Sequence, residues 1–433
     1  MVERVLALAA RRAHAAEVYF EEGESRPIEF EHNELKYIHT KSRRALSLRV
    51  IHEGRIGFAS TTGLSDPDSL VSRALESAHF GQEAKLEFPG PAELPAVAVY
   101  DQAVADFPVE QGVALGRDAI GAVRAEFDDV QCEAEVSKWV GRTRIANTSG
   151  LDVTSEQTAC DAYLVGVRVR EGNILWVGDG ESSRRLVTDF DRYVAKVVGD
   201  VRAAETECAA PSGEMPVLFT ARAMRLLLGI MQVAVNGKYI QKGASPLVGR
   251  LGEQVLDERV SLWDDGTVDY ADGSSPFDDE GTAARRTALF DSGVLTNYVF
   301  DLQTAGVLGT RTTGNASRGF ASQPVPDTTN LVLDPGDESL EAMVAGMERG
   351  LLVDQVIGGG QSNVLAGEFS VNVSLGFLIE KGQRVGRVKD CMVAGNVFGI
   401  FQRIRAIGDT QETHGSTIAP AVCFDAVSVA GGG

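Results

Sequence analysis

The chain has 433 residues, with 41 Lys and Arg against 61 Asp and Glu, which gives a formal net charge of −20 at pH 7. Hydrophobic residues make up 44% and charged residues 24%, so the composition is that of an ordinary folded protein and excludes intrinsic disorder over most of the chain. An acidic chain without a basic patch is also a poor ligand for nucleic acid or for an acidic membrane surface, and neither is expected as a partner.

Neither a targeting segment nor a membrane span is expected. The amino terminus has no positive segment ahead of a long apolar stretch, and no uninterrupted apolar run reaches about 18 residues. The five cysteines, Cys132, Cys160, Cys208, Cys391 and Cys423, are widely spread and include no C-x-x-C pair. Such spacing is typical of reduced thiols, so we expect a soluble cytoplasmic protein.

The first 80 residues are expected to fold as a helix, several strands and a second helix. Apolar residues at helical spacing over 2–13 predict the first helix, and alternating apolar residues over 46–50 predict a strand. The Ser-Asp-Pro sequence at 65–67 predicts the start of the second helix, because it combines a capping side chain with a first-turn proline. Strands are expected at 17–22, 27–31, 45–51 and 57–61.

A second unit of the same order is expected after a linker. Three prolines within residues 86–99 predict a segment that crosses the surface. A helix at 109–126 and a helix at 182–205 enclose the strands of this unit. We therefore expect residues 1–210 to form an N-terminal α+β domain built from two helix–strands–helix units, although no residue-level repeat supports a duplication. Strands are expected at 130–140, 142–147, 151–160 and 162–170.

Residues 211–433 are expected to form a C-terminal domain rich in strands. A short strand at 217–219 precedes Thr220, which is placed to cap a helix with one apolar face that runs to Val235. Beyond it, short strands separated by glycines predict a barrel-like or sandwich domain, with one helix at 340–351. The fold class is therefore α+β. Strands are expected at 259–263, 286–290, 294–300, 330–333, 368–375, 377–380 and 421–429.

Residues suited to metal or nucleophilic chemistry are few. A zinc peptidase helix typically carries H-E-x-x-H, but the His-Glu pair at 52–53 has no second histidine within the next turn. The sequence has no G-x-S-x-G nucleophile motif and no P-loop. His414 beside Glu412 could act as a base, although a solvated loop histidine is the favoured interpretation. We therefore predict no catalytic residue and no metal ligand in this chain.

Two acidic clusters are the strongest local signals. One is Asp-Asp-Gly at 264–266, and the other is Asp-Asp-Glu-Gly at 278–281. Ca²⁺ loops alternate their carboxylates so that they converge on one ion, whereas these acids are adjacent and point in different directions. An Asp-Gly turn is the favoured interpretation of the first cluster. The second could cap a strand or bind an amine of a peptide.

An ordered series of motifs runs through the C-terminal half. It comprises residues 278–281, Gly-Val-Leu at 293–295 and Thr-Gly-Asn-Ala-Ser-Arg at 313–318, with further matching segments at 243–252, 346–351, 367–371 and 420–431. With these motifs the chain resembles the TldD/TldE (PmbA) peptidase family, also called modulators of DNA gyrase. The candidate substrate-cleft or family-motif residues are Asp278, Asp279, Glu280, Asn315, Arg318 and His414.

The resemblance also indicates which kind of subunit this is. TldD-type subunits carry an H-E-x-x-x-H helix and a later cysteine that hold zinc, with the glutamate as general base. The corresponding helix here, at 220–235, contains no histidine and no acid, and the segment before Pro420 offers Glu412 and His414 but no cysteine. The resemblance therefore implies a TldE (PmbA)-type subunit without zinc. It would pair as a heterodimer with a TldD-type zinc subunit to cut unfolded or leader peptides.

Two other functions stay open at this point. One is a self-sufficient hydrolase with atypical ligands such as His414, Glu412 and the acids of 278–280. The other is a non-enzymatic protein that binds extended peptides, for which glycine-rich strand edges would suit strand addition. Under the favoured interpretation the chain needs no cofactor of its own and is inactive alone.

Overall fold

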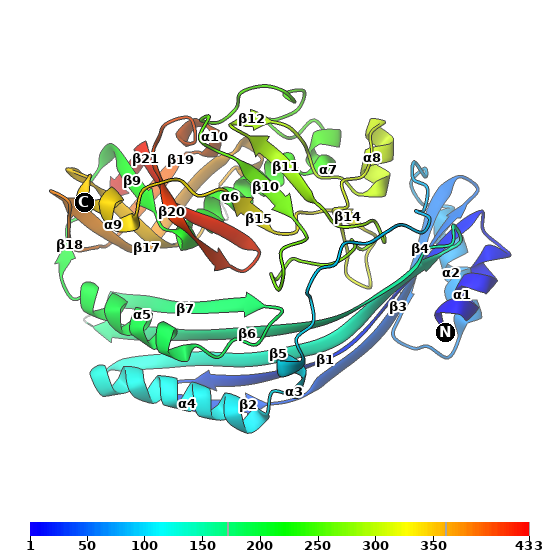
Figure 1. Ribbon diagram of the computed structural model, residues 1–433, viewed down its shortest axis with the longest axis horizontal. Coiled ribbons are helices and arrows are strands. Elements are labelled where there is room, and N and C mark those ends of the chain that lie inside the picture. The colour runs from blue at the N-terminus through cyan, green and yellow to red at the C-terminus, as the bar shows by residue number, and fades with distance from the viewer. Residues whose placement is uncertain (171–172, 360–361, 433) are drawn as a thin grey trace.

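Two β-sheets organise the structure, one formed by the first half of the chain and one by the second (Figure 1). The computed structural model describes residues 1–170, 173–359 and 362–432. Figure 1 shows the long strands of the first sheet bending beneath the second half of the chain. This arrangement confirms the α+β class and the strand-rich character of the C-terminal half.

The first sheet has seven strands among the described residues, and its neighbouring strands are all antiparallel. In chain order the elements of this half are α1 (Val2–Ala10), β1 (Ala15–Glu31), β2 (Glu34–Ile38), β3 (Lys41–His52), β4 (Arg55–Thr61), α2 (Pro67–Ala78), α3 (Gln102–Asp106), α4 (Val109–Glu126), β5 (Val130–Asn147), β6 (Asp152–Arg170), β7 (Asn173–Ser183) and α5 (Phe190–Ala203). The order across the sheet is β4-β3-β1-β5-β6-β7, and β2 pairs with the end of β1.

The two faces of this sheet have different partners, and β1 shows the division. Its even-numbered residues face the helices: Val18 packs in a core with α1 and α2, and Phe30 packs in a core with α4 and α5. Its odd-numbered residues, such as Glu17 and Tyr19, point to the other face, because successive side chains of a strand alternate. That face lies against the C-terminal half.

The second sheet closes on itself. Its elements are β8 (Glu207–Cys208), β9 (Gly213–Phe219), α6 (Ala221–Val235), α7 (Gly237–Gln241), β10 (Leu262–Asp265), β11 (Arg286–Asp291), β12 (Val294–Leu295), α8 (Leu302–Leu308), β13 (Ala316–Ser317), β14 (Val325–Pro326), β15 (Leu331–Leu333), α9 (Leu340–Ala345), β16 (Arg349–Ile357), a 3₁₀ turn (Val364–Ala366), β17 (Glu368–Glu380), β18 (Gln383–Val388), β19 (Cys391–Asn396), α10 (Val397–Ile400), β20 (Ile404–His414) and β21 (Thr417–Gly431). Strand β19 pairs with both β17 and β21, so the path β21-β9-β16-β17-β19 forms a barrel-like ring.

Helix α6 packs into the core of this half as its apolar face predicts. Thr220 caps it, since the threonine Oγ1 accepts the N–H of Ala223 at 3.4 Å. Its fully buried side chains join the main hydrophobic cluster. A hydrophobic face that large is expected to account for most of the stability of the helix. The predicted face is confirmed for Met224, Leu227, Leu228, Met231 and Val235.

Several predicted boundaries are wrong, and strand pairing explains them. The strands predicted separately at 17–22 and 27–31 form the single strand β1, and β5, β6 and β17 each likewise unite two predicted strands, because antiparallel neighbours continue through the interruptions. The helix predicted at 182–205 begins only at Phe190, after the unforeseen strand β7. The helix predicted at 340–351 ends at Ala345, and β16 follows, because pairing with β17 and β9 outweighs local helical preference. Strands β18, β19 and β20 were also missed.

The structure also shows the state of the cysteines and the length and polarity of the helices. None of the five cysteines, all of which lie in described residues, forms a disulfide, and only Cys208 is not buried. No helix in the described ranges is long and apolar enough to cross a membrane.

Candidate functional site

A cavity of about 470 Å³ lies where loops of the C-terminal half meet the uncovered face of the first sheet. The sheet contributes Tyr19 and Trp139, among others, and the loops contribute residues 273–279, 314–317 and 327–329. Two predicted motifs, 278–281 and 313–318, therefore supply part of its wall. We take this cavity as the candidate site because both halves of the chain and both motifs line it.

The loop at 278–281 is a buried hub of main-chain hydrogen bonds. Asp278 is 8% exposed and Glu280 is fully buried. Oδ1 of Asp278 accepts the N–H groups of Glu280 and Thr282, each at 2.9 Å, and Oδ2 accepts the N–H of Ala316 at 3.0 Å. The Asp278 carboxyl therefore joins the two motifs by main-chain hydrogen bonds.

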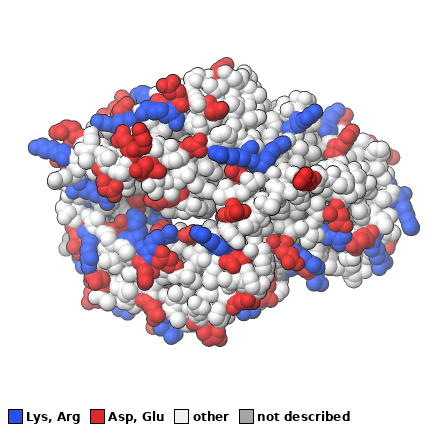
Figure 2. Space-filling view, viewed as in Figure 1, with Lys and Arg blue, Asp and Glu red and all other residues white. Residues whose placement is uncertain are grey.

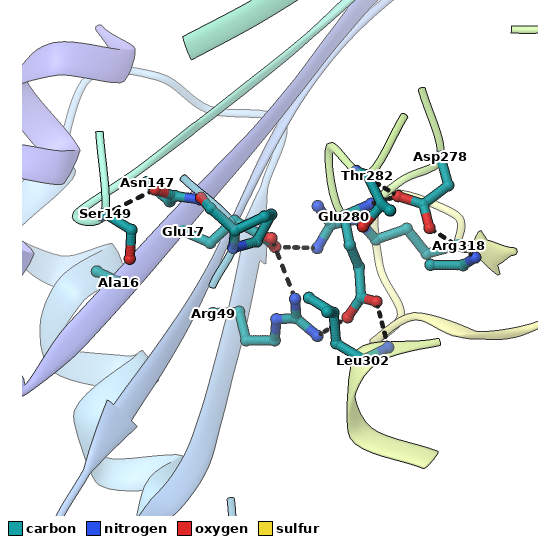
Figure 3. Close-up of polar contacts among 12 residues, drawn as sticks. Ala16, Glu17, Arg49, Asn147, Ser149, Asp278, Glu280, Thr282, Leu302 and Arg318 are labelled. Atoms are coloured by element: carbon teal, nitrogen blue, oxygen red, sulfur yellow. Dashed lines mark hydrogen bonds and ion pairs between the residues drawn. The ribbon is translucent and has the colours of Figure 1, made fainter. Parts of the chain in front are cut away.

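A buried chain of four ionic side chains connects this hub to the first sheet (Figure 3). Glu17 Oε1 lies 2.8 Å from Arg318 Nη1, and Glu17 Oε2 lies 3.0 Å from Arg49 Nη2. Arg49 Nη1 lies 2.6 Å from Glu280 Oε1. Glu280 Oε2 accepts the N–H of Leu302 at the start of α8, at 2.7 Å. Two positive and two negative charges thus alternate, and they tie β1 and β3 to the C-terminal loops.

Burial and pairing shift the ionisation of these groups in opposite directions. Burial, reinforced by Glu280, raises the pKa of Asp278, and burial raises the pKa of Glu280 although Arg49 opposes it. Burial also raises the pKa of Asp279 to about 6, despite Arg318 nearby. For Glu17, burial is outweighed by the Arg318 and Arg49 guanidinium groups, so the pKa of Glu17 is lowered.

The first acidic cluster also belongs to the site. Asp264, at the end of β10, is 2% exposed and does more than form a turn. Its Oδ2 accepts Asn315 Nδ2 at 2.5 Å, and its Oδ1 accepts the N–H of Thr329 at 2.6 Å. Burial raises the pKa of Asp264 to about 6. Asp264 therefore holds the Asn315 amide in place at the cavity wall.

His414 lies elsewhere, and the interpretation as a solvated loop histidine is wrong. It is the last residue of β20, its side chain is only 11% exposed, and Nε2 lies 3.1 Å from Glu412 Oε2. Neither residue lines the cavity. Of the six candidate residues, Asp278, Asp279 and Asn315 line the cavity, while Glu280 and Arg318 lie behind it in the ionic chain. The structure does not bring His414 to them.

Glu17 and Arg49 are the functional-site residues that sequence reasoning missed. Both are buried charged residues with apolar neighbours on each side in their strands, and their exposed fractions are 0% and 2%. A charge within an alternating strand signals a special environment, because charged side chains are rarely fully buried unless paired. That signal was present in both strands, but the partners lie in the other half of the chain.

Comparison with known proteins agrees with this geometry. The family model for the "PmbA/TldA metallopeptidase C-terminal domain" matches residues 212–431, and the model for "PmbA/TldA metallopeptidase domain 1" matches residues 16–78. The chain belongs to the PmbA/TldD metallopeptidase family. The first matched region contains Glu280 and Arg318, and the second contains Glu17 and Arg49. The ionic chain therefore joins the two matched regions.

Relatives match along most of the chain. An uncharacterised protein of Methanocaldococcus jannaschii is 27% identical over 98% of both chains, and metalloprotease PmbA of Escherichia coli O157:H7 is 23% identical over 99% of this chain and 95% of its own. A metalloprotease TldD homolog of Haemophilus influenzae is 32% identical over 47% of this chain and 42% of its own. Among solved structures, TldE of Thermococcus kodakarensis has the same fold, with a TM-score of 0.91, 24% identity and 99% coverage of both chains.

The family name implies a metal, and the residues of α6 do not fit one. Arg222, Arg225 and Gln232 are the polar side chains of this helix, and guanidinium and amide groups are not zinc ligands. Arg222 donates to the carbonyl of Gly178, and Gln232 donates to Asp327 Oδ1 at 2.7 Å, so both are occupied by the protein itself. In the ranges that the structure describes, no group of three or more His, Cys, Asp or Glu side chains is placed to hold a metal ion.

Proposed function

We propose that this chain is the zinc-free, TldE (PmbA)-type subunit of a two-subunit peptidase. It would act in the cytoplasm as a heterodimer with a TldD-type subunit, which would supply the zinc. The substrates would be unfolded proteins or leader peptides. The observation that carries the proposal is α6, where the position expected for zinc ligands holds arginine, glutamine and buried apolar residues.

In this role the chain would shape the substrate path and would not cut the peptide. Peptide hydrolysis needs a barrier reduction of many kcal/mol, which an activated water or nucleophile normally provides. The candidate site offers instead a polar cavity between two halves that buried ion pairs connect. Such a cavity suits binding and positioning of an extended chain.

Surface charge gives no support for a nucleic-acid partner. On the face shown in Figure 2, acidic and basic side chains are interspersed, and no broad basic area appears there. With a net charge of −20, contact with phosphate groups is unfavourable. We therefore propose neither nucleic acid nor membrane as a partner.

The test is reconstitution with a TldD-type subunit. Each chain alone and their mixture would be analysed by size exclusion and by cleavage of an unfolded peptide. We expect a stable heterodimer that cleaves, activity that disappears when the partner's catalytic glutamate is changed, and no cleavage by this chain alone. Cleavage by this chain alone, unaffected by a chelator, would instead support a self-sufficient hydrolase. Peptide binding without assembly would support a binding protein.

A further inference from the structure

Asn315, in the cavity wall, has a hydrogen-bond acceptor that the described residues leave unused. Asn315 is 2% exposed, and its Nδ2 donates to Asp264 Oδ2 at 2.5 Å and to the carbonyl of Asp327 at 3.0 Å. Its Oδ1 is buried and accepts no hydrogen bond from any described residue. Because buried polar atoms are normally paired, this oxygen calls for a donor from a ligand or from water.

Asp279 supplies an available charge in the same wall. Its Oδ2 accepts the N–H of Arg318 at 2.8 Å, and no cationic side chain among the described residues lies within ion-pair distance of it. The guanidinium of Arg318 is directed instead to Glu17. Glu280 is enclosed with Arg49 and cannot reach a ligand, so of these two adjacent acids only Asp279 faces the cavity.

Three other charged side chains of the lining, Glu21, Glu22 and Arg43, already have ion-pair partners. Arg43 pairs with Glu21 at 3.0 Å. Glu22 pairs with Arg44 and Arg142 at 2.8 and 2.6 Å. Arg184 is the remaining cation of the lining. Burial lowers the pKa of Arg184, and the nearby Asp272 and Asp161 oppose this shift. The lining contains five carboxyl groups and two guanidinium groups, and burial raises the pKa of Asp278. The four other carboxyl groups still outnumber the guanidinium groups, so an entering cation is favoured over an anion.

An indole ring completes the cavity. Trp139 of β5 lies flat across Gly23 of β1 and Gly141 of its own strand: a Cβ at Gly23 would lie 2.7 Å from the indole Nε1, and a Cβ at Gly141 would lie 2.5 Å from Cζ2. The two glycines therefore make room for the ring against the sheet. No cation of the described residues stacks on this ring, although Arg318 stacks on Tyr19 at 4.3 Å. A free indole face attracts an ammonium group.

We propose that this cavity binds a primary ammonium group of the peptide substrate, held by the Asp279 carboxylate, Asn315 Oδ1 and the Trp139 indole. An ammonium group has three donors and one positive charge. The unused Asn315 oxygen can accept one of these donors, and the Asp279 carboxylate can pair with the charge. The group is either the N-terminal α-amine or a lysine side chain. The inference rests on the proposed function, because it names the chemical group by which the cavity would recognise a peptide.

The experiment uses four versions of one ten-residue Ala/Ser/Gln peptide with a C-terminal fluorophore. The first has a free N-terminus, the second is N-acetylated, the third is N-acetylated with one lysine, and the fourth is N-acetylated with acetyl-lysine. Fluorescence anisotropy measures their binding to the purified full chain and to the heterodimer. We expect at least one amine-bearing peptide to bind about tenfold more tightly than its acetylated match. The first pair reports the α-amine, and the second pair reports the lysine side chain.

Variants assign the preference to the proposed residues. Asp279→Asn is expected to remove the preference for the amine and to leave binding of the acetylated peptide unchanged. Glu22→Gln, an acid-to-amide change in the same cavity at a carboxylate already paired with two arginines, should keep the preference. Thermal unfolding of each variant shows whether it is folded, and the wild-type comparison of acetylated and free peptides needs no variant at all.

The outcomes separate this inference from the proposed function. Equal binding of all four peptides, or no binding of any, would overturn the inference even if the heterodimer cleaves peptides. A preference that survives Asp279→Asn in a folded variant would also overturn it. Failure to assemble with a zinc subunit would contradict the proposed function, yet a preference for the amine by this chain alone would still support the cavity assignment.

Discussion

Removal of Arg49 tests whether the buried ionic chain holds the two halves together. In Arg49→Met, Glu17 keeps Arg318 at 2.8 Å, whereas Glu280 loses its only cationic contact within the described residues and retains the Leu302 N–H. The variant therefore leaves one buried carboxylate without a counter-charge. Breaking a buried pair in this way typically costs about 3–5 kcal/mol. We expect a loss of that size in the free energy of unfolding.

The pH dependence of this loss and a double variant test the role of the Glu280 charge. Burial already raises the pKa of Glu280, and without Arg49 it should rise further. Protonation then relieves the penalty, so the loss should be smaller at about pH 5 than at about pH 8, by roughly 1.4 kcal/mol for each unit that the pKa rises. The variant Arg49→Met with Glu280→Gln should recover much of the loss, since the glutamine is neutral and its oxygen can still accept the Leu302 N–H.

Denaturant unfolding followed by far-UV circular dichroism and tryptophan fluorescence measures these changes. Arg250→Met is the control, because Arg250 pairs with Glu253 at 2.8 Å at the surface, with side chains 35% and 55% exposed. Exposed pairs contribute about 0–1 kcal/mol, so the control should lose little. If Arg49→Met costs less than about 1 kcal/mol, or if the double variant is no more stable than the single one, the ionic chain does not stabilise the contact between the two halves.

Three further predictions concern ionisation, metal content and thiols. Burial raises the pKa of Asp279 to about 6, above its value in the unfolded chain, so the contribution of this group to stability is complete below about pH 4 and is lost as the pH rises through 6. Asp279→Asn should therefore gain stability relative to the wild type between about pH 4 and pH 7 in thermal melts. A stability difference that stays constant over this pH range would contradict the burial argument. Purified protein should contain well under one zinc per chain after dialysis, and stoichiometric zinc by elemental analysis would show that ligands exist outside α6. Burial raises the pKa of Cys132 and Cys160 to about 11 and that of Cys423 to about 12. A thiol reagent should therefore modify the half-buried Cys208 first and all five thiols only after denaturation. Rapid modification of all five in the native state would show that the cores of both halves open.

Local features were readable from the sequence where one element settles its own structure. The face of α6, its Thr220 cap and its lack of zinc ligands depend only on residues 220–235, and the structure confirms the face and the cap. Helix 109–126 and the helix that begins at Pro67 also follow from local periodicity and capping, and both are confirmed. The α+β class was predictable for the same reason, because it requires only the type of each element.

Tertiary structure decided every feature that depends on distant partners. Residues 349–357 form a strand because β9 and β17 supply its hydrogen bonds, and those partners begin at Gly213 and Glu368. The acids at 278–280 were visible as a motif, but the third donor to the Asp278 carboxylate, the N–H of Ala316, lies 38 residues further along the chain. Sequence periodicity reports only neighbours along the chain, so it cannot reveal such pairings.

The site itself shows this division most clearly. Its acids and its Asn315 were visible as motifs, whereas the arrangement of their charges was not. Arg49 and Glu280 are 231 residues apart in the chain, and only the folding of the first sheet against the C-terminal loops brings them to 2.6 Å. The sequence alone shows which chemical groups are present and that residues 220–235 contain no histidine, cysteine or acid. The fold decided which carboxylate is neutralised, which faces the cavity and which cannot be reached, because burial and ion pairing depend on contacts between the two halves.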